Sequence, residues 1–142
     1  MEDEALGLIF KRIFHAVKKD TDNKMKEWEL TMSQAIVLEY LNNTPSDNIT
    51  QKDIEHHFNL QHPTVSGILK RLEKHGFIRT EVNKADRRAK NIFITEKAAL
   101  VDTRAKKHQA LMEETFVKGF SVREIETLRA YLKRVLINVT EE

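Results

Sequence analysis

The feature that most constrains the fold is a change of hydrophobic period in the middle of the chain. Apolar residues recur mostly at helical spacing over residues 5–75, and then the period becomes two: Ile78, Thr80 and Val82 alternate with Arg79 and Glu81, and Ile92 and Ile94 alternate with Phe93. A polar and strongly basic segment, residues 83–91, separates these runs, and this arrangement predicts a single β-hairpin. Only 4 Gly and 2 Pro occur in 142 residues, too few for the many tight turns of an all-β fold, so the rest is expected to be helical.

Capping residues predict where the helices begin and end. Thr50, followed by Asp53 three residues later, predicts the start of a short helix. Pro63 suits the first turn of the next helix, because its missing N–H would be unpaired there, and Gly76 suits the position just beyond the end. The helix expected at about residues 32–41 is predicted to be capped by Thr31 or by Ser33. The expected helices cover about residues 5–26, 32–41, 51–58, 62–75, 96–116 and 122–140.

The positive charge is concentrated in one stretch of the chain. Residues 61–90 carry 8 Lys and Arg against 3 Asp and Glu, a net charge of +5, whereas the whole chain carries only +2. Residues 1–60 carry −4 and residues 91–142 carry +1. A localised basic patch is typical of a surface that contacts nucleic acid, although a solvated lysine-rich face is the commoner explanation for any single cluster.

The order of helix, short helix, turn, helix and basic hairpin predicts a winged helix-turn-helix. A helix that enters the major groove offers short polar groups near its N-terminus and cations on its flanks. The helix at 62–75 offers His62, Thr64, Ser66, Gly67, Lys70 and Arg71. The hairpin, or wing, offers Lys84, Arg87, Arg88 and Lys90 at its tip, and arginine suits a narrow, negative minor groove.

Gly67 is unusual for the interior of a helix. It costs about 1 kcal/mol of helix propensity relative to alanine. Either a close approach of the backbone to DNA or tight packing against a neighbouring helix would explain it.

Two segments are similar to the multiple-antibiotic-resistance regulator (MarR) family of bacterial winged-helix transcription factors. Asp86-Arg87-Arg88 followed by residues 91–97 resembles the family's Asp-x-Arg wing and its exit strand, and residues 69–78 resemble the end of its recognition helix. The resemblance extends over essentially the whole chain. It implies that Asp86 orients the wing arginine, Arg88, which enters the minor groove, and it adds Gln61 to the contacts of the recognition helix. The DNA contacts expected are therefore Gln61, His62, Thr64, Ser66, Gly67, Lys70, Arg71, Lys84, Asp86, Arg87, Arg88 and Lys90.

A homodimer is expected from the residues and from the resemblance. The helices at 5–17 and 121–140 carry more apolar stripe than a small winged domain can cover, and a two-fold dimer is the commonest way to bury such a stripe. The predicted organisation is mainly α with a small β-hairpin wing. It comprises an N-terminal dimerisation helix at 1–29, a winged helix-turn-helix domain at 30–95 and dimerisation helices at 96–142.

The family resemblance also implies a small, often aromatic or acidic, effector that loosens DNA binding. The candidate lining residues are Phe10, Phe14, His15, Trp28, Tyr40 and Phe58. Core packing is the alternative, and it is the commoner role of aromatic residues at helical spacing.

Other kinds of function find little support in the sequence. The chain has no cysteine, which excludes disulfides, thiol nucleophiles and Cys-ligated zinc, and its six histidines show no metal-ligand spacing. Motifs for phosphate-binding loops, dinucleotide binding, zinc proteases and serine hydrolases are missing, so neither an enzyme nor a cofactor is expected. An acidic N-terminus and no apolar run of about 18 residues favour a cytoplasmic protein without a membrane span.

The sequence therefore predicts a sequence-specific transcriptional regulator that binds palindromic double-stranded DNA as a homodimer, and the resemblance favours a repressor over an activator. A winged-helix protein–protein adaptor without specific DNA readout is the main alternative, although an adaptor has no need of four cations at one tip. Nonspecific DNA packaging is a third.

Overall fold

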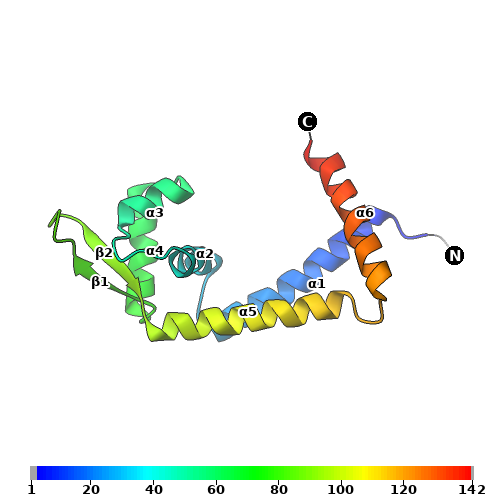
Figure 1. The fold of residues 1–142 in the computed structure, drawn as a ribbon, viewed down its shortest axis with the longest axis horizontal. Coiled ribbons are helices and arrows are strands. Elements are labelled where there is room, and N and C mark those ends of the chain that lie inside the picture. The colour runs from blue at the N-terminus through cyan, green and yellow to red at the C-terminus, as the bar shows by residue number, and fades with distance from the viewer. Residues whose placement is uncertain (1–2, 142) are drawn as a thin grey trace. The chain divides into compact units, whose positions relative to one another are not determined.

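The computed structural model describes residues 3–141 and contains six helices and one two-stranded sheet in that range (Figure 1). The elements are α1 (Leu6–Glu27), α2 (Met32–Asn43), α3 (Gln51–Phe58), α4 (His62–Lys74), β1 (Ile78–Val82), β2 (Lys90–Ile94), α5 (Glu96–Phe116) and α6 (Val122–Thr140). This confirms the predicted fold, mainly α with one hairpin. None of the helices in the described range is long and apolar enough to cross a membrane.

The helix boundaries follow the capping residues. α2 is capped by Thr31 rather than Ser33, because Thr31 Oγ1 accepts the N–H of Gln34 at 3.3 Å while Gln34 Oε1 accepts the N–H of Thr31 at 3.1 Å. At the start of α3, Asp53 Oδ2 accepts the N–H of Thr50 at 2.8 Å. Each of these bonds satisfies a backbone donor that the first helical turn leaves without a helical partner.

The chain divides into two compact units, residues 1–102 and 103–142. The first, here called the winged unit, has a single core to which α2, α3, α4, the hairpin and the start of α5 contribute. Ile54, Val65, Leu72 and Phe77 are completely buried in it. Asn59 closes α3 in the left-handed conformation (φ 51°), and Gly76 does the same after α4 (φ 77°), so each helix stops where the chain must turn.

The hairpin is antiparallel and rests on the core by one face. Ile78 pairs with Ile94 and Thr80 with Ile92. Ile92 also donates its N–H to the carbonyl of Ile49 at 2.8 Å, and a single bridge joins Thr50 to Asn91. The segment before α3 is therefore fastened to β2, and this contact fixes the base of the wing against the helix-turn-helix.

The second unit consists of the end of α5 and α6. Ser121 and Glu124 form the predicted capping box, with Ser121 Oγ accepting the N–H of Glu124 at 3.1 Å and Glu124 Oε2 accepting the N–H of Ser121 at 2.9 Å. None of the described residues of α6 is buried within the protomer. Large apolar side chains are instead exposed along it, including Val122, Tyr131, Leu132, Leu136, Ile137 and Val139.

Candidate nucleic-acid interface

Helix α4 separates its buried face cleanly from its exposed face. Val65, Ile68 and Leu72 face the core, whereas the polar residues of the first turns lie at the surface. Gln61 stands at the N-cap and makes no side-chain capping bond. The uncapped N–H groups of such a helix start are suited to hydrogen bonding with phosphate.

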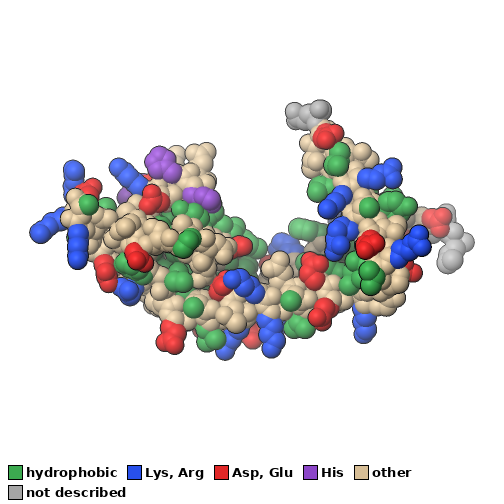
Figure 2. Space-filling view, viewed as in Figure 1, with side chains coloured by type: hydrophobic (Ala, Val, Ile, Leu, Met, Phe, Trp, Pro, Cys, Tyr) green, Lys and Arg blue, Asp and Glu red, His purple; other side chains and the backbone are tan. Residues whose placement is uncertain are grey.

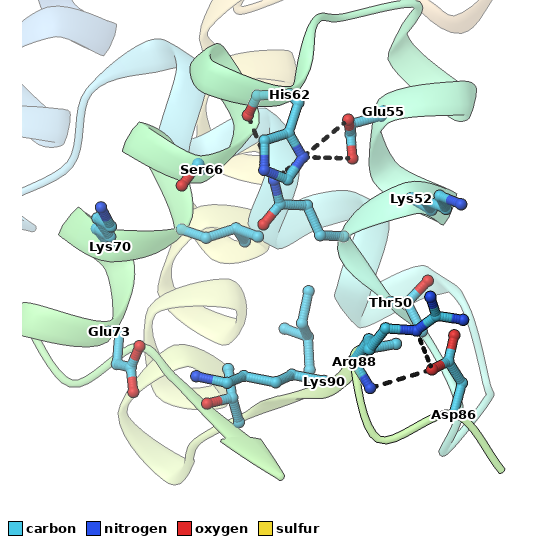
Figure 3. A pocket seen from close by; sticks show the side chains of 15 residues that line it. Thr50, Lys52, Glu55, His62, Ser66, Lys70, Glu73, Asp86, Arg88 and Lys90 are labelled. Atoms are coloured by element: carbon cyan, nitrogen blue, oxygen red, sulfur yellow. Dashed lines mark hydrogen bonds and ion pairs between the residues drawn. The ribbon is translucent and has the colours of Figure 1, made fainter. Parts of the chain in front are cut away.

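A groove of about 660 Å³ runs between α3, α4 and the wing (Figure 3). It brings together six of the twelve residues predicted to contact DNA, three from α4 and three from the wing. These six are His62, Ser66, Lys70, Asp86, Arg88 and Lys90. Residues that lie more than 25 positions apart in the chain thus share one surface.

His62 is held at the mouth of this groove by α3. Its Nδ1 lies 3.0 Å from Gln51 Nε2 and 3.3 Å from Glu55 Oε1. With Gln51 donating, the neutral ring presents a donor at Nε2; with Nδ1–H donating to Glu55, the neutral ring presents an acceptor there. The partner that His62 takes on α3 therefore decides what its outer edge offers to a base or a phosphate.

The wing tip is ordered by carboxylate and amide side chains. Asp86 Oδ1 accepts the backbone N–H of Arg88 at 3.0 Å and lies 3.5 Å from Arg88 Nε (Figure 3). The Arg88 side chain is 95% exposed, so the ion pair itself contributes little stability. The hydrogen bond to the backbone N–H holds Asp86 beside Arg88, as expected if Asp86 orients this arginine.

The other six predicted residues lie beside the groove rather than in it. Four are on or next to α4 (Gln61, Thr64, Gly67 and Arg71) and two are at the wing tip (Lys84 and Arg87). Five of them are exposed, and Gly67 is half-buried. In Figure 2 several Lys and Arg side chains lie over the hairpin, and others are spread over the rest of the visible face.

The structure bears on one of the two explanations of Gly67 that the sequence left open, namely packing against a neighbouring helix. A Cβ built on Gly67 would meet only Arg71 Nη1, at 4.0 Å, so no neighbouring helix of the protomer packs against this position. Tight packing within the protomer therefore does not explain the glycine, and close approach of the backbone to DNA stays a prediction.

Several groove residues escaped sequence reasoning. Thr50, Gln51, Lys52 and Glu55, from the start of α3, line the groove opposite α4. The only signal for them in the sequence is that they follow the helix cap at Thr50. Their relevance depends on the angle at which α3 and α4 pack, which no local pattern specifies.

The aromatic candidates for effector binding fall into two groups. Trp28, Tyr40 and Phe58 are half-buried and pack against the core of the winged unit, with the Tyr40 ring 4.2 Å from that of His57. Phe10, Phe14 and His15 are exposed on α1, where the last two rings lie 6.1 Å apart. Within residues 3–141 no group of three or more potential metal ligands is found.

A helix-turn-helix joined to a basic wing, with one groove between them, defines the winged-helix class of DNA-binding proteins. Comparison with known proteins agrees, because a MarR family model matches residues 28–89. Solved structures of MepR from Staphylococcus aureus match over nearly the whole chain. A DNA complex of MepR is 30% identical with a TM-score of 0.87, covering 94% of this chain and 99% of that one.

Two further MepR structures give similar values. A point mutant is 30% identical with a TM-score of 0.83, covering 96% of this chain and all of the other. The structure described as MepR, a transcription regulator of the multidrug efflux pump MepA, is 29% identical with a TM-score of 0.81 and covers 96% and 100%. The chain therefore belongs to the MarR family, and its function is DNA-binding transcriptional regulation.

Proposed function

We propose that the protein is a repressor that binds an inverted-repeat operator as a homodimer, with α4 in the major groove and the wing tip in the adjacent minor groove. The observation that carries this proposal is the groove between α4 and the wing, which gathers polar and cationic residues from both elements on one surface. The B-DNA major groove, about 12 Å wide, admits a helix, and its base edges are read by short polar side chains at the start of that helix. Thr64 and Ser66 stand at such positions.

The dimer is supported by the apolar surface that one protomer leaves uncovered. Leu6, Ile13 and Phe14 on α1 are 69%, 52% and 63% exposed, and α6 has a similar exposed stripe. Surfaces of this kind mark association interfaces, and burial contributes about 25 cal/mol per Å². We assign dimerisation to residues 1–29 and 96–142, and DNA binding to residues 30–95. Two copies of the wing and of α4 would double the phosphate contacts.

Repression by binding alone needs no catalytic group, and we propose neither an enzymatic activity nor a cofactor for this chain. A cytoplasmic location follows for a regulator that must reach DNA. The MepR structure solved with DNA supports the same mode of action here, because the fold matches it over almost the full length.

An effector that releases DNA is a further part of the proposal. Phe10, Phe14 and His15 are its exposed candidates, and Trp28 and Tyr40 are half-buried ones. Trp28 is the only tryptophan of the chain, so its fluorescence reports on binding nearby. A saturable change on adding benzoate, the simplest aromatic acid, together with a weaker operator complex, is expected. Unchanged fluorescence and operator affinity across a panel of aromatic acids would contradict an effector of this class.

The experiment that tests the operator part is selection from a random double-stranded DNA library at physiological salt. The expected product is an inverted repeat whose half-sites lie about one helical turn apart, since a two-fold dimer presents two recognition helices. Recovery of no consensus by a folded dimer would contradict sequence-specific regulation. Binding at low salt would then indicate packaging of DNA, and absence of binding would indicate the adaptor role.

The wing contribution is tested by comparing two neighbouring arginines. We expect Arg88→Ala to weaken operator binding by tenfold or more, in line with about 1–3 kcal/mol for a specific DNA contact. Arg87→Ala is the matched control, because it removes the same charge from the same tip but its side chain lies outside the groove lining. Equal losses for the two variants would mean that the wing acts only through its total charge.

A further inference from the structure

The wing tip carries the cation proposed to enter the minor groove, yet it has almost no apolar support of its own. Residues 84–88 are all exposed, and the Arg88 side chain is 95% exposed. A loop without buried side chains gains its order from hydrogen bonds. The side chains that make these bonds therefore decide how well Arg88 is positioned.

Asn83, directly after β1, makes several of these bonds. Its Oδ1 accepts the N–H groups of Ala85 and Asp86, both at 2.9 Å. Its own backbone N–H donates to the carbonyl of Ala89 at 3.0 Å, and Ala89 in turn donates to the carbonyl of Asp86 at 3.0 Å. Asn83 thus joins the two sides of the tip by hydrogen bonds and holds the backbone of Asp86 in place.

The remaining polar group of Asn83 faces the opposite way. Its Nδ2 donates to Asn91 Oδ1 at 2.8 Å, and Asn91 Nδ2 reaches Asn48 Oδ1, before α3, at 3.5 Å. Asn83 and Asn91 are both half-buried. These contacts form a continuous path from the segment before α3, through β2 and Asn83, to Asp86.

We propose that Asn83 is a positioning residue for DNA binding, which acts through Asp86 to set the direction of Arg88. The last step of the path is the pair of contacts from Asp86 Oδ1 to the N–H and Nε of Arg88, at 3.0 Å and 3.5 Å. Asn83 itself need not touch DNA. The inference rests on the proposed function, since it requires that Arg88 contacts the operator.

The test is a double-mutant cycle between Asn83 and Arg88, measured as operator affinity of the full-length dimer. Asn83→Ala removes three hydrogen bonds and is expected to weaken binding about tenfold. In the Arg88→Ala background the same change is expected to have almost no further effect, because the side chain that Asn83 positions is already gone. Asn83→Ser, whose hydroxyl can accept the same turn bonds more weakly, is expected to lie between wild type and Asn83→Ala.

A second readout concerns sequence preference at the edges of the site. Arginine in a minor groove favours narrow A·T-rich sequence. Asn83→Ala is therefore expected to lose a preference for A·T-rich flanks while it keeps the half-site consensus read by α4. A merely structural defect would weaken binding to all sequences alike and would lower the melting temperature.

The outcomes separate the inference from the proposed function. If Arg88→Ala binds as tightly as wild type, the wing assignment itself fails. If Arg88→Ala binds the operator more weakly but Asn83→Ala does not, the wing assignment stands and the positioning role of Asn83 is wrong. The same conclusion holds if Asn83→Ala lowers operator affinity equally in the wild-type and Arg88→Ala backgrounds. If Asn83→Ala does not fold, Asn83→Ser replaces it in the same cycle. An intermediate loss of operator affinity that is seen only when Arg88 is present supports the proposal. An equal loss with and without Arg88 overturns it.

Discussion

Gly67→Ala is expected to change protein stability and DNA affinity in opposite directions. Gly67 lies within α4 and does not have a positive φ, so alanine can adopt its backbone conformation. The added Cβ would meet only Arg71 Nη1, at 4.0 Å, which is ordinary van der Waals contact with a flexible side chain. The helix therefore gains the propensity difference, about 1 kcal/mol, with no steric cost. For a domain of this size that amounts to about 2–4 °C in Tm.

The same methyl group is expected to weaken operator binding. If the glycine lets the backbone of α4 approach DNA closely, an added carbon overpacks the interface at a cost of about 1 kcal/mol or more per protomer. An inverted repeat engages two protomers, so the loss is about 2 kcal/mol, or roughly thirtyfold in Kd.

Thermal melting of the free dimer and titration of a fluorescent operator measure the two effects separately. Ser33→Ala is the control, a neutral exchange in the exposed first turn of α2, and it should leave the operator Kd unchanged. A Gly67→Ala variant with a raised Tm and an unchanged Kd would refute close approach of the backbone to DNA. A lowered Tm would refute the conclusion that nothing packs against this position.

Three further predictions concern base readout, association and the core. Ser66→Ala is expected to alter the base pair preferred at one position of each half-site, by about 1–3 kcal/mol of discrimination, and selection from random DNA that returned the same consensus would exclude Ser66 as a base contact. Leu132→Glu, on the exposed stripe of α6, is expected to give a monomer by light scattering at micromolar concentration, since an interface would have to bury the new carboxylate; an unchanged mass would place the dimer contact elsewhere. Ile54→Ala, at a completely buried position, is expected to cost about 2–5 kcal/mol of unfolding free energy in urea, and a loss below 1 kcal/mol would mean that the winged core is more plastic than its packing indicates.

Part of the interface could be predicted because it depends on local signals. The Thr50–Asp53 pair, Pro63 and Gly76 mark helix boundaries through interactions within one or two turns, and the structure has α3 and α4 at these bounds. The alternation around residues 83–91 predicted the hairpin for the same reason. A local signal was ambiguous only where two residues could serve equally, as with Thr31 and Ser33 at the start of α2.

The contacts between separate elements that shape the site could not be predicted from local sequence signals. The approach of Gln51 and Glu55 to His62 depends on the packing of α3 against α4, and Asn48 meets Asn91 across 43 positions of the chain. Whether Gly67 lies against a neighbour or in open space likewise depends on where the other helices lie.

The sequence by itself thus determined the elements, their order and the concentration of positive charge at residues 61–90, because periodicity, capping and charge are properties of neighbouring residues. The tertiary structure alone decided which of these charges share one groove, that His62 lies within reach of Gln51 and Glu55, and how Asn83 links the segment before α3 to Arg88. Each of these depends on distances between elements, and those distances are set by the packing of a common core.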